Sequence, residues 1–92
     1  MLSVTATLRF WAAAREAAGA AEETVGATTL ADALDEAVRR RGGDGGRGAE
    51  LRRVIERSSV LLDGVQVGRA DPESVALPDG AVVEILPPFA GG

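Results

Sequence analysis

Apolar and polar residues alternate at the start of the chain. Residues 2–10 carry two interleaved sets, an apolar one and a polar one: Leu2, Val4, Ala6, Leu8 and Phe10 against Ser3, Thr5, Thr7 and Arg9. Alternate side chains of a β-strand point to opposite faces, so the pattern predicts a strand with one buried face. The alanine-rich residues 12–18 then favour a short helix, which Gly19 can end in a left-handed conformation.

The middle of the chain changes to helical spacing. Residues 29–41 predict the main amphipathic helix, because apolar side chains recur at Leu30, Leu34, Ala37 and Val38. Thr28 or Thr29 can cap its start, and the arginines at 39–41 suit the negative end of its dipole. Residues 42–46 predict a flexible glycine loop, and residues 49–57 a second helix with one apolar side, Leu51, Val54 and Ile55. A short strand is expected near residues 21–26, anchored by Val25.

The last third of the chain predicts three strands. Residues 59–62 and 65–67 flank Asp63-Gly64, the two-residue signal for a hairpin with a type I′ turn. A loop over residues 70–80 ends in a Pro-Asp-Gly turn, and residues 81–86 alternate as the final strand. Pro87-Pro88 ends the pairing because proline has no N–H to donate. The elements describe one α+β domain over residues 1–86 and a flexible C-terminal tail over residues 87–92.

Composition then removes most kinds of chemistry. The chain has no Cys, His, Lys or Tyr, so the usual general bases, nucleophiles and soft metal ligands are missing. The acidic residues are scattered over predicted helix faces and turns, which indicates solvated surface and no metal site. A formal charge of −4 opposes binding to nucleic acid. With no basic leader and no long apolar run, we expect a cytoplasmic protein without membrane contact.

The most informative segment is the end of the chain. Pro87-Pro88-Phe89-Ala90-Gly91-Gly92 follows the last predicted strand directly. Prolines favour an extended path, so six residues reach roughly 20 Å from the domain, and glycines without Cβ atoms can thread a narrow channel. The terminal carboxylate, with a pKa of about 3.5, is ionised and unreactive near neutral pH. It requires activation, for example by ATP, before a sulfur donor can convert it to a thiocarboxylate.

Three segments resemble a known family: residues 8–19 (LRFWAAAREAAG), residues 79–86 (DGAVVEIL) and above all residues 87–92 (PPFAGG). They are similar to the molybdopterin synthase small subunits, the MoaD branch of the MoaD/ThiS sulfur carriers, over essentially the whole chain. The glycine loop at residues 42–48 is longer than that branch leads us to expect. The resemblance implies a ubiquitin-like β-grasp fold: a mixed sheet with one main helix packed on it, the first and last strands parallel at its centre, and an extended C-terminal tail.

The resemblance also implies roles for the tail. Gly92 corresponds to the residue that is adenylated and converted to a thiocarboxylate, and Gly91, Ala90 and Phe89 would occupy a channel of the partner. The implied partners are an E1-like adenylyltransferase of the MoeB kind, which uses ATP and Mg²⁺, a large synthase subunit of the MoaE kind, and a sulfur donor system. No cofactor would be bound tightly by this chain. The delivered sulfur would build the dithiolene of molybdenum cofactor on a pyranopterin.

A second candidate site is a docking patch on the outer face of the sheet. Phe10 belongs to the buried set of the first strand, and side chains alternate between the two faces. Trp11, the next residue, is therefore expected on the outer face near Val82 and Leu86. Arg9 and Glu84 share that face and could pair there, but orienting a partner is the better use for two exposed charges. Arg15 is a further candidate contact with a partner. An exposed aromatic beside aliphatic residues is typical of a docking surface. The alternative is that Trp11 covers one edge of the core.

Three other functions remain open from the sequence. The first is the same carrier chemistry for thiamine or cysteine synthesis. The second is a ubiquitin-like modifier that joins Gly92 to amines of other proteins; without Lys it cannot build isopeptide-linked chains on itself. The third is an interaction module with an incidental tail.

Overall fold

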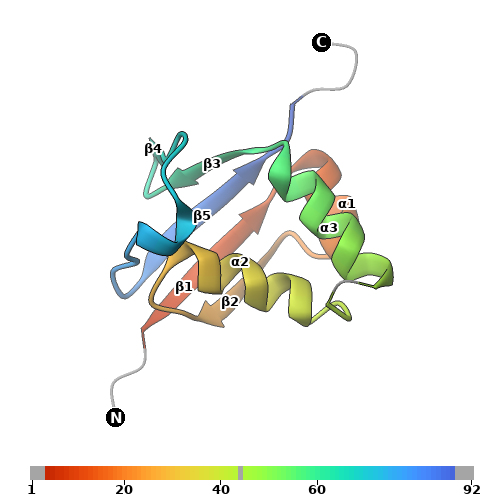
Figure 1. Ribbon diagram of the computed structural model, residues 1–92, viewed down its shortest axis with the longest axis horizontal. Coiled ribbons are helices and arrows are strands. Elements are labelled where there is room, and N and C mark those ends of the chain that lie inside the picture. The colour runs from red at the N-terminus through yellow and green to blue at the C-terminus, as the bar shows by residue number, and fades with distance from the viewer. Residues whose placement is uncertain (1–3, 44, 89–92) are drawn as a thin grey trace.

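Five strands form one mixed sheet in the order β2-β1-β5-β3-β4 (Figure 1). The structure is a computed structural model that describes residues 4–43 and 45–88. Its strands are β1 (Thr5–Phe10), β2 (Glu22–Gly26), β3 (Ser59–Leu62), β4 (Val65–Gln66) and β5 (Ala81–Leu86). β1 and β5 pair in parallel at the centre, from Ala6 opposite Ala81 to Phe10 opposite Ile85, and the other neighbours are antiparallel. The expected β-grasp topology is confirmed.

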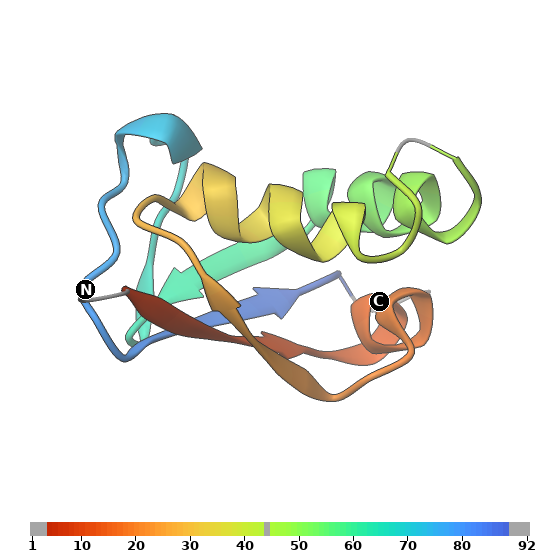
Figure 2. The ribbon, with the colours of Figure 1, turned by 90° about the horizontal axis from the view of Figure 1, so that it is seen from below.

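The helices leave one face of the sheet bare. α2 (Leu30–Arg39) and α3 (Gly46–Glu56) lie over one face, and α1 (Ala12–Ala18) packs against α3 where β1 and β5 end (Figures 1 and 2). A 3₁₀ turn, η1 (Pro72–Ser74), lies beside α2. Because no described helix covers the opposite face, the outward side chains of β1, β5 and β3 line an open surface.

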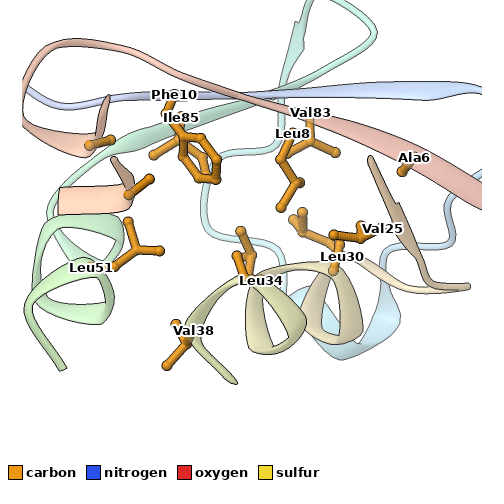
Figure 3. Packing of buried hydrophobic residues seen from close by; sticks show 14 of the residues in the cluster. Ala6, Leu8, Phe10, Val25, Leu30, Leu34, Val38, Leu51, Val83 and Ile85 are labelled. Carbon is orange, nitrogen blue, oxygen red and sulfur yellow. The ribbon is translucent and has the colours of Figure 1, made fainter. Parts of the chain in front are cut away.

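The core lies between the sheet and the helices. The inward residues of β1 and β5, among them Leu8, Phe10, Val83 and Ile85, pack against Leu30, Leu34, Val38 and Leu51 from the helices (Figure 3). Alanines complete it where elements approach closely, including Ala14, Ala33, Ala37 and Ala81. Full burial of one large apolar side chain stabilises a fold by about 1.5–3 kcal/mol, so this cluster holds the central strands rigidly.

Helix boundaries differ from the prediction at two places. The main helix covers Leu30–Arg39 rather than 29–41, since Thr29 is its N-cap and accepts a hydrogen bond from the Asp32 N–H at 3.1 Å. α3 begins at Gly46 rather than residue 49, so the last residue of the loop expected over residues 42–46 belongs to the helix. A Cβ at Gly48 would overlap the Gly43 carbonyl oxygen, and the Gly48 N–H donates to the Arg41 carbonyl at 3.0 Å. Glycine there lets α3 start directly against the end of α2.

The other corrections are small. Residue 4 lies outside β1, β4 ends at Gln66 rather than residue 67, and α3 ends at Glu56 rather than residue 57. The hairpin turn is as predicted, with Asp63 and Gly64 at φ of 49° and 84°. The Asp63 side chain also accepts a hydrogen bond from the Val82 N–H at 2.9 Å, which ties the hairpin to β5.

Candidate functional site

The chain leaves the sheet at a firmly held point. β1 and β5 end side by side, and the Trp11 N–H donates to the Ile85 carbonyl at 3.2 Å. Pro87, which follows β5, is buried, and Pro88 is exposed. The predicted reactive and channel residues lie outside the described residues: Gly92, Gly91, Ala90 and Phe89. Their roles therefore stay predictions, but the point from which they extend is described.

The outer face carries a polar network around Trp11. The indole Nε1–H donates to Glu84 Oε2 at 3.1 Å, and the guanidinium carbon of Arg9 lies 5.3 Å from the ring centroid. Trp11 is 42% exposed and is not among the buried core residues, so it lies on the outer face as the strand pattern predicts. Its role as a docking residue stays a prediction. A cation over an exposed aromatic ring contributes about 0.5–1 kcal/mol.

Arg9 and Glu84 lie opposite each other on β1 and β5, as their shared face requires, but the ion pair that the sequence allowed between these two described residues does not form. Arg9 pairs instead with Glu22 of β2 at 3.8 Å, and Glu84 accepts the indole N–H of Trp11. An exposed pair of this kind contributes about 0–1 kcal/mol.

The other residues predicted for the docking patch are Val82, Leu86 and Arg15. Val82 and Leu86 are half-buried on either side of Glu84 along the outer row of β5. Arg15 is exposed on α1 and lines a hollow with Arg9 and Trp11. The structure thus brings Arg9, Trp11, Glu84 and Leu86 together on the outer face near the exit of the chain, with Arg15 beside them, whereas Val82 lies at the start of β5, away from the exit.

A groove on the other side of Trp11 adds residues that the sequence analysis missed. It has a volume of about 610 Å³ and is lined by Trp11, Ala12, Arg57, Ser59, Leu86, Pro87 and Pro88. The end of α3, the start of β3, α1 and the end of β5 converge here (Figure 1). Ser59 could have been found from the strand register, since it lies opposite Leu86. Arg57 could not, because only the packing of α3 brings it to this place.

Ala12 forms part of the groove wall in an unusual backbone conformation. Its φ is 48°, in the left-handed region, while Trp11 before it is extended, at φ −117° and ψ 149°. An L-residue with a Cβ atom pays about 1–2 kcal/mol for the left-handed conformation. The bend at Ala12 allows Trp11 to point outward while α1 turns back toward α3.

Replacing this alanine by glycine tests that strain. We expect Ala12→Gly to raise the free energy of unfolding by up to about 1 kcal/mol, because glycine adopts this φ freely. Ala13→Gly is the matched control and should lower it by about 1 kcal/mol, as glycine does within a helix. Chemical denaturation of both variants measures the difference. Equal losses in the two variants would contradict strain at Ala12.

The part of the chain that the structure describes has neither a metal-binding group of acidic side chains nor a membrane-spanning helix. No group of three or more Asp or Glu side chains there is placed to hold a metal ion. Within residues 4–43 and 45–88, no helix is long and apolar enough to cross a membrane.

Comparison with known families decides the class of the protein. Residues 8–92 match the ThiS family, from β1 to the final glycine. The chain belongs to the ThiS family. No curated protein matches this ThiS-family chain at a significant level of sequence similarity. The match includes the groove, the outer-face network and the terminal glycines, so all the candidate site residues fall within the family region.

Solved structures with the same fold include small archaeal modifier proteins and subunits of molybdopterin-converting factor. Small archaeal modifier protein 1 from Methanosarcina acetivorans superposes with a TM-score of 0.77 at 21% identity, covering 100% of both chains. Its counterpart from Haloferax volcanii gives 0.72 at 25% identity, covering 96% of this chain and 99% of that one. A chain from the complex of subunits 1 and 2 of molybdopterin-converting factor from Helicobacter pylori gives 0.64 at 20%, covering 97% and 100%. This ThiS-family chain therefore has the fold of MoaD/ThiS sulfur carriers and ubiquitin-like modifiers.

Proposed function

We propose that this ThiS-family protein is a sulfur carrier that serves as the small subunit of a molybdopterin synthase. The observation that carries the proposal is the ending Pro-Pro-Phe-Ala-Gly-Gly, which follows the central strand β5 without an intervening element. A central strand fixes the root of the tail, and the glycines give its end the smallest cross-section a peptide can have. The reactive group is the carboxylate of Gly92.

The chemistry proceeds in two balanced steps on that carboxylate. A carboxylate oxygen attacks the α-phosphorus of ATP, which forms an acyl-adenylate and releases pyrophosphate. A hydrosulfide ion supplied by the sulfur donor system then attacks the acyl carbon, AMP leaves with one of the original carboxylate oxygens, and a thiocarboxylate remains. ATP and Mg²⁺ are held by an E1-like adenylyltransferase, so this chain contributes no catalytic side chain and needs no tightly bound cofactor. Because ATP is a cytoplasmic substrate, the proposal locates the carrier in the cytoplasm.

The sulfur is then delivered to a pyranopterin precursor bound by a large synthase subunit. Gly91, Ala90 and Phe89 would lie in the channel of that subunit, with the outer-face patch docked at its mouth. The neighbour from Helicobacter pylori is a complex of two such subunits, which supports a partner of this kind. Thiamine or cysteine synthesis would use the same tail chemistry with a different acceptor.

The proposal is tested by the mass of the protein isolated from its native host. Exchange of one oxygen for sulfur adds about 16 Da. Because Arg69 is the last basic residue, trypsin releases residues 70–92 as one peptide, and the added mass must be confined to it. Consistent absence of this species during active cofactor synthesis would count decisively against a carrier role.

A second candidate function is conjugation to other proteins, and the similarity to small archaeal modifier protein 1 favours it. The same tryptic digest distinguishes the two functions. A modifier leaves residues 70–92 attached through an amide to lysines of target proteins, whereas a carrier leaves the thiocarboxylate on the free peptide. The absence of Lys from the chain excludes isopeptide-linked chains through its own side chains.

A further inference from the structure

The length of the tail restricts where a partner can lie. Pro88 is the last described residue and forms part of the groove wall, and four residues follow it. Four residues span at most about 14 Å. An enzyme that reacts with Gly92 must therefore open its active site within that distance of Pro88. Its surface then covers the groove.

The groove offers two kinds of contact to such a surface. Trp11, Leu86 and Pro87 supply an apolar wall, and Arg57 supplies a positive charge. Arg57 is exposed and, among the described residues, forms no ion pair. A carboxylate on the covering surface would give this guanidinium a partner at the moment when water is excluded from the groove.

Charge near the groove favours an acidic surface even though the chain as a whole is acidic. The formal net charge is −4, yet Arg57 lies on one side of Trp11 and Arg15 on the other. Like Arg57, Arg15 is exposed and lacks an ion pair within the described residues. These two arginines offer a partner two cations near the exit of the tail, beside the carboxylates of Glu84 and Glu22, and such charges orient a partner more than they add affinity.

We propose that the groove binds an apolar side chain of the enzyme that receives the tail, and that Arg57 pairs with a carboxylate beside that side chain. The inference rests on the proposed function, because it takes the activating enzyme and the acceptor subunit as the partners. It makes Arg57 a residue that selects the partner rather than one that acts on Gly92. The competing role for Arg57 is purely structural, as a cation at the C-terminal end of α3.

Binding measurements with both purified partners separate these roles. The probes are the adenylyltransferase and the large synthase subunit of the same organism, titrated calorimetrically with the full chain. Arg57→Glu should weaken binding about 10-fold and Arg57→Gln about 3-fold, with unchanged melting temperatures. Trp11→Ala should weaken it about 30-fold. The control Arg53→Glu changes an exposed arginine of the same helix that does not line the groove, and it should bind like the parent.

The outcomes distinguish failure of the groove from failure of the carrier function. If the parent protein binds the partners and Arg57→Glu binds them as well as Arg53→Glu does, the proposed role of the groove is wrong and the proposed function stands. A lowered melting temperature in Arg57→Gln with unchanged affinity assigns Arg57 to the end of α3 and also overturns that role. Parent protein that binds neither partner and carries no added sulfur mass overturns both.

Discussion

Deletion of Gly91 and Gly92 is expected to abolish sulfur transfer and to leave the melting temperature nearly unchanged. The new carboxylate, on Ala90, would end two residues short, roughly 7 Å from the position that the activating enzyme requires. Misplacement by even about 1 Å can cost 100-fold in rate. The two glycines have no side chains to bury, and within residues 4–43 and 45–88 every residue of the core cluster precedes Leu86. Transfer measured with purified activating enzyme and acceptor, beside a thermal melt, tests both parts.

Addition of one residue after Gly92 is the matched variant. It keeps both glycines but converts the reactive carboxylate into an amide and moves the new terminus past the reactive position. Transfer should again fall at least about 100-fold, while binding through the outer face and the groove should survive. Turnover of either variant at the parent rate would rule out Gly92 as the reactive end.

Replacement of Arg41 should have the largest effect on stability. Arg41 donates to both carboxylate oxygens of Glu23, at 3.0 and 2.5 Å, and to the carbonyls of Ala18 and Ala37 at 2.7 and 2.8 Å. Its guanidinium also lies over the Phe10 ring, 5.4 Å from the centroid. Only 10% of the Arg41 side chain and 15% of the Glu23 side chain are exposed. One residue thus joins the ends of α1 and α2 to β2 and to the core.

We expect Arg41→Ala to lower the free energy of unfolding by about 2–3 kcal/mol, because it removes the hydrogen bonds of a charged group and leaves the nearly buried Glu23 with only its longer ion pair to Arg40, at 3.7 Å. Arg39→Ala is the control: that side chain is 78% exposed, and its loss should change stability by less than about 0.5 kcal/mol. Replacing Glu23 by Leu in the Arg41→Ala variant should recover part of the loss. Denaturant titration measures all three. A loss below about 1 kcal/mol in Arg41→Ala would show that the junction contributes little.

Leu8 and Arg41 differ in how much of their environment the local sequence pattern predicts. Leu8 could be assigned to the core because a strand repeats every two residues, and that period alone decides which face is buried. Helical spacing places Arg41 on the same face as Leu34, Ala37 and Val38, four and three residues after the last two. Spacing does not identify its partners, which come from α1, β2 and α2. Burial of a charge depends on the tertiary arrangement of its partners.

The same distinction applies to the site. The exit of the tail from the central strand follows from the position of Pro87-Pro88 after an alternating segment, and the outward position of Trp11 follows from strand parity. The groove does not follow from local pattern, because Arg57 reaches it only when α3 packs on the sheet. The start of α3 was missed for a related reason: glycine has poor helix propensity, but at Gly48 the close approach to Gly43 outweighs that preference.

The buried position of Pro87 sets how the carrier presents its end to a docked enzyme. Pro88 and the four residues after it link Pro87 to the carboxylate of Gly92. Within a hemisphere of about 14 Å radius, the farthest that four residues can reach from Pro88, one carboxylate corresponds to an effective concentration on the order of 0.1 M. That value exceeds by far the concentration at which a cell holds any free carrier. Once a partner covers the groove, delivery of the carboxylate becomes an intramolecular event, and the affinity of docking alone decides which enzyme receives it.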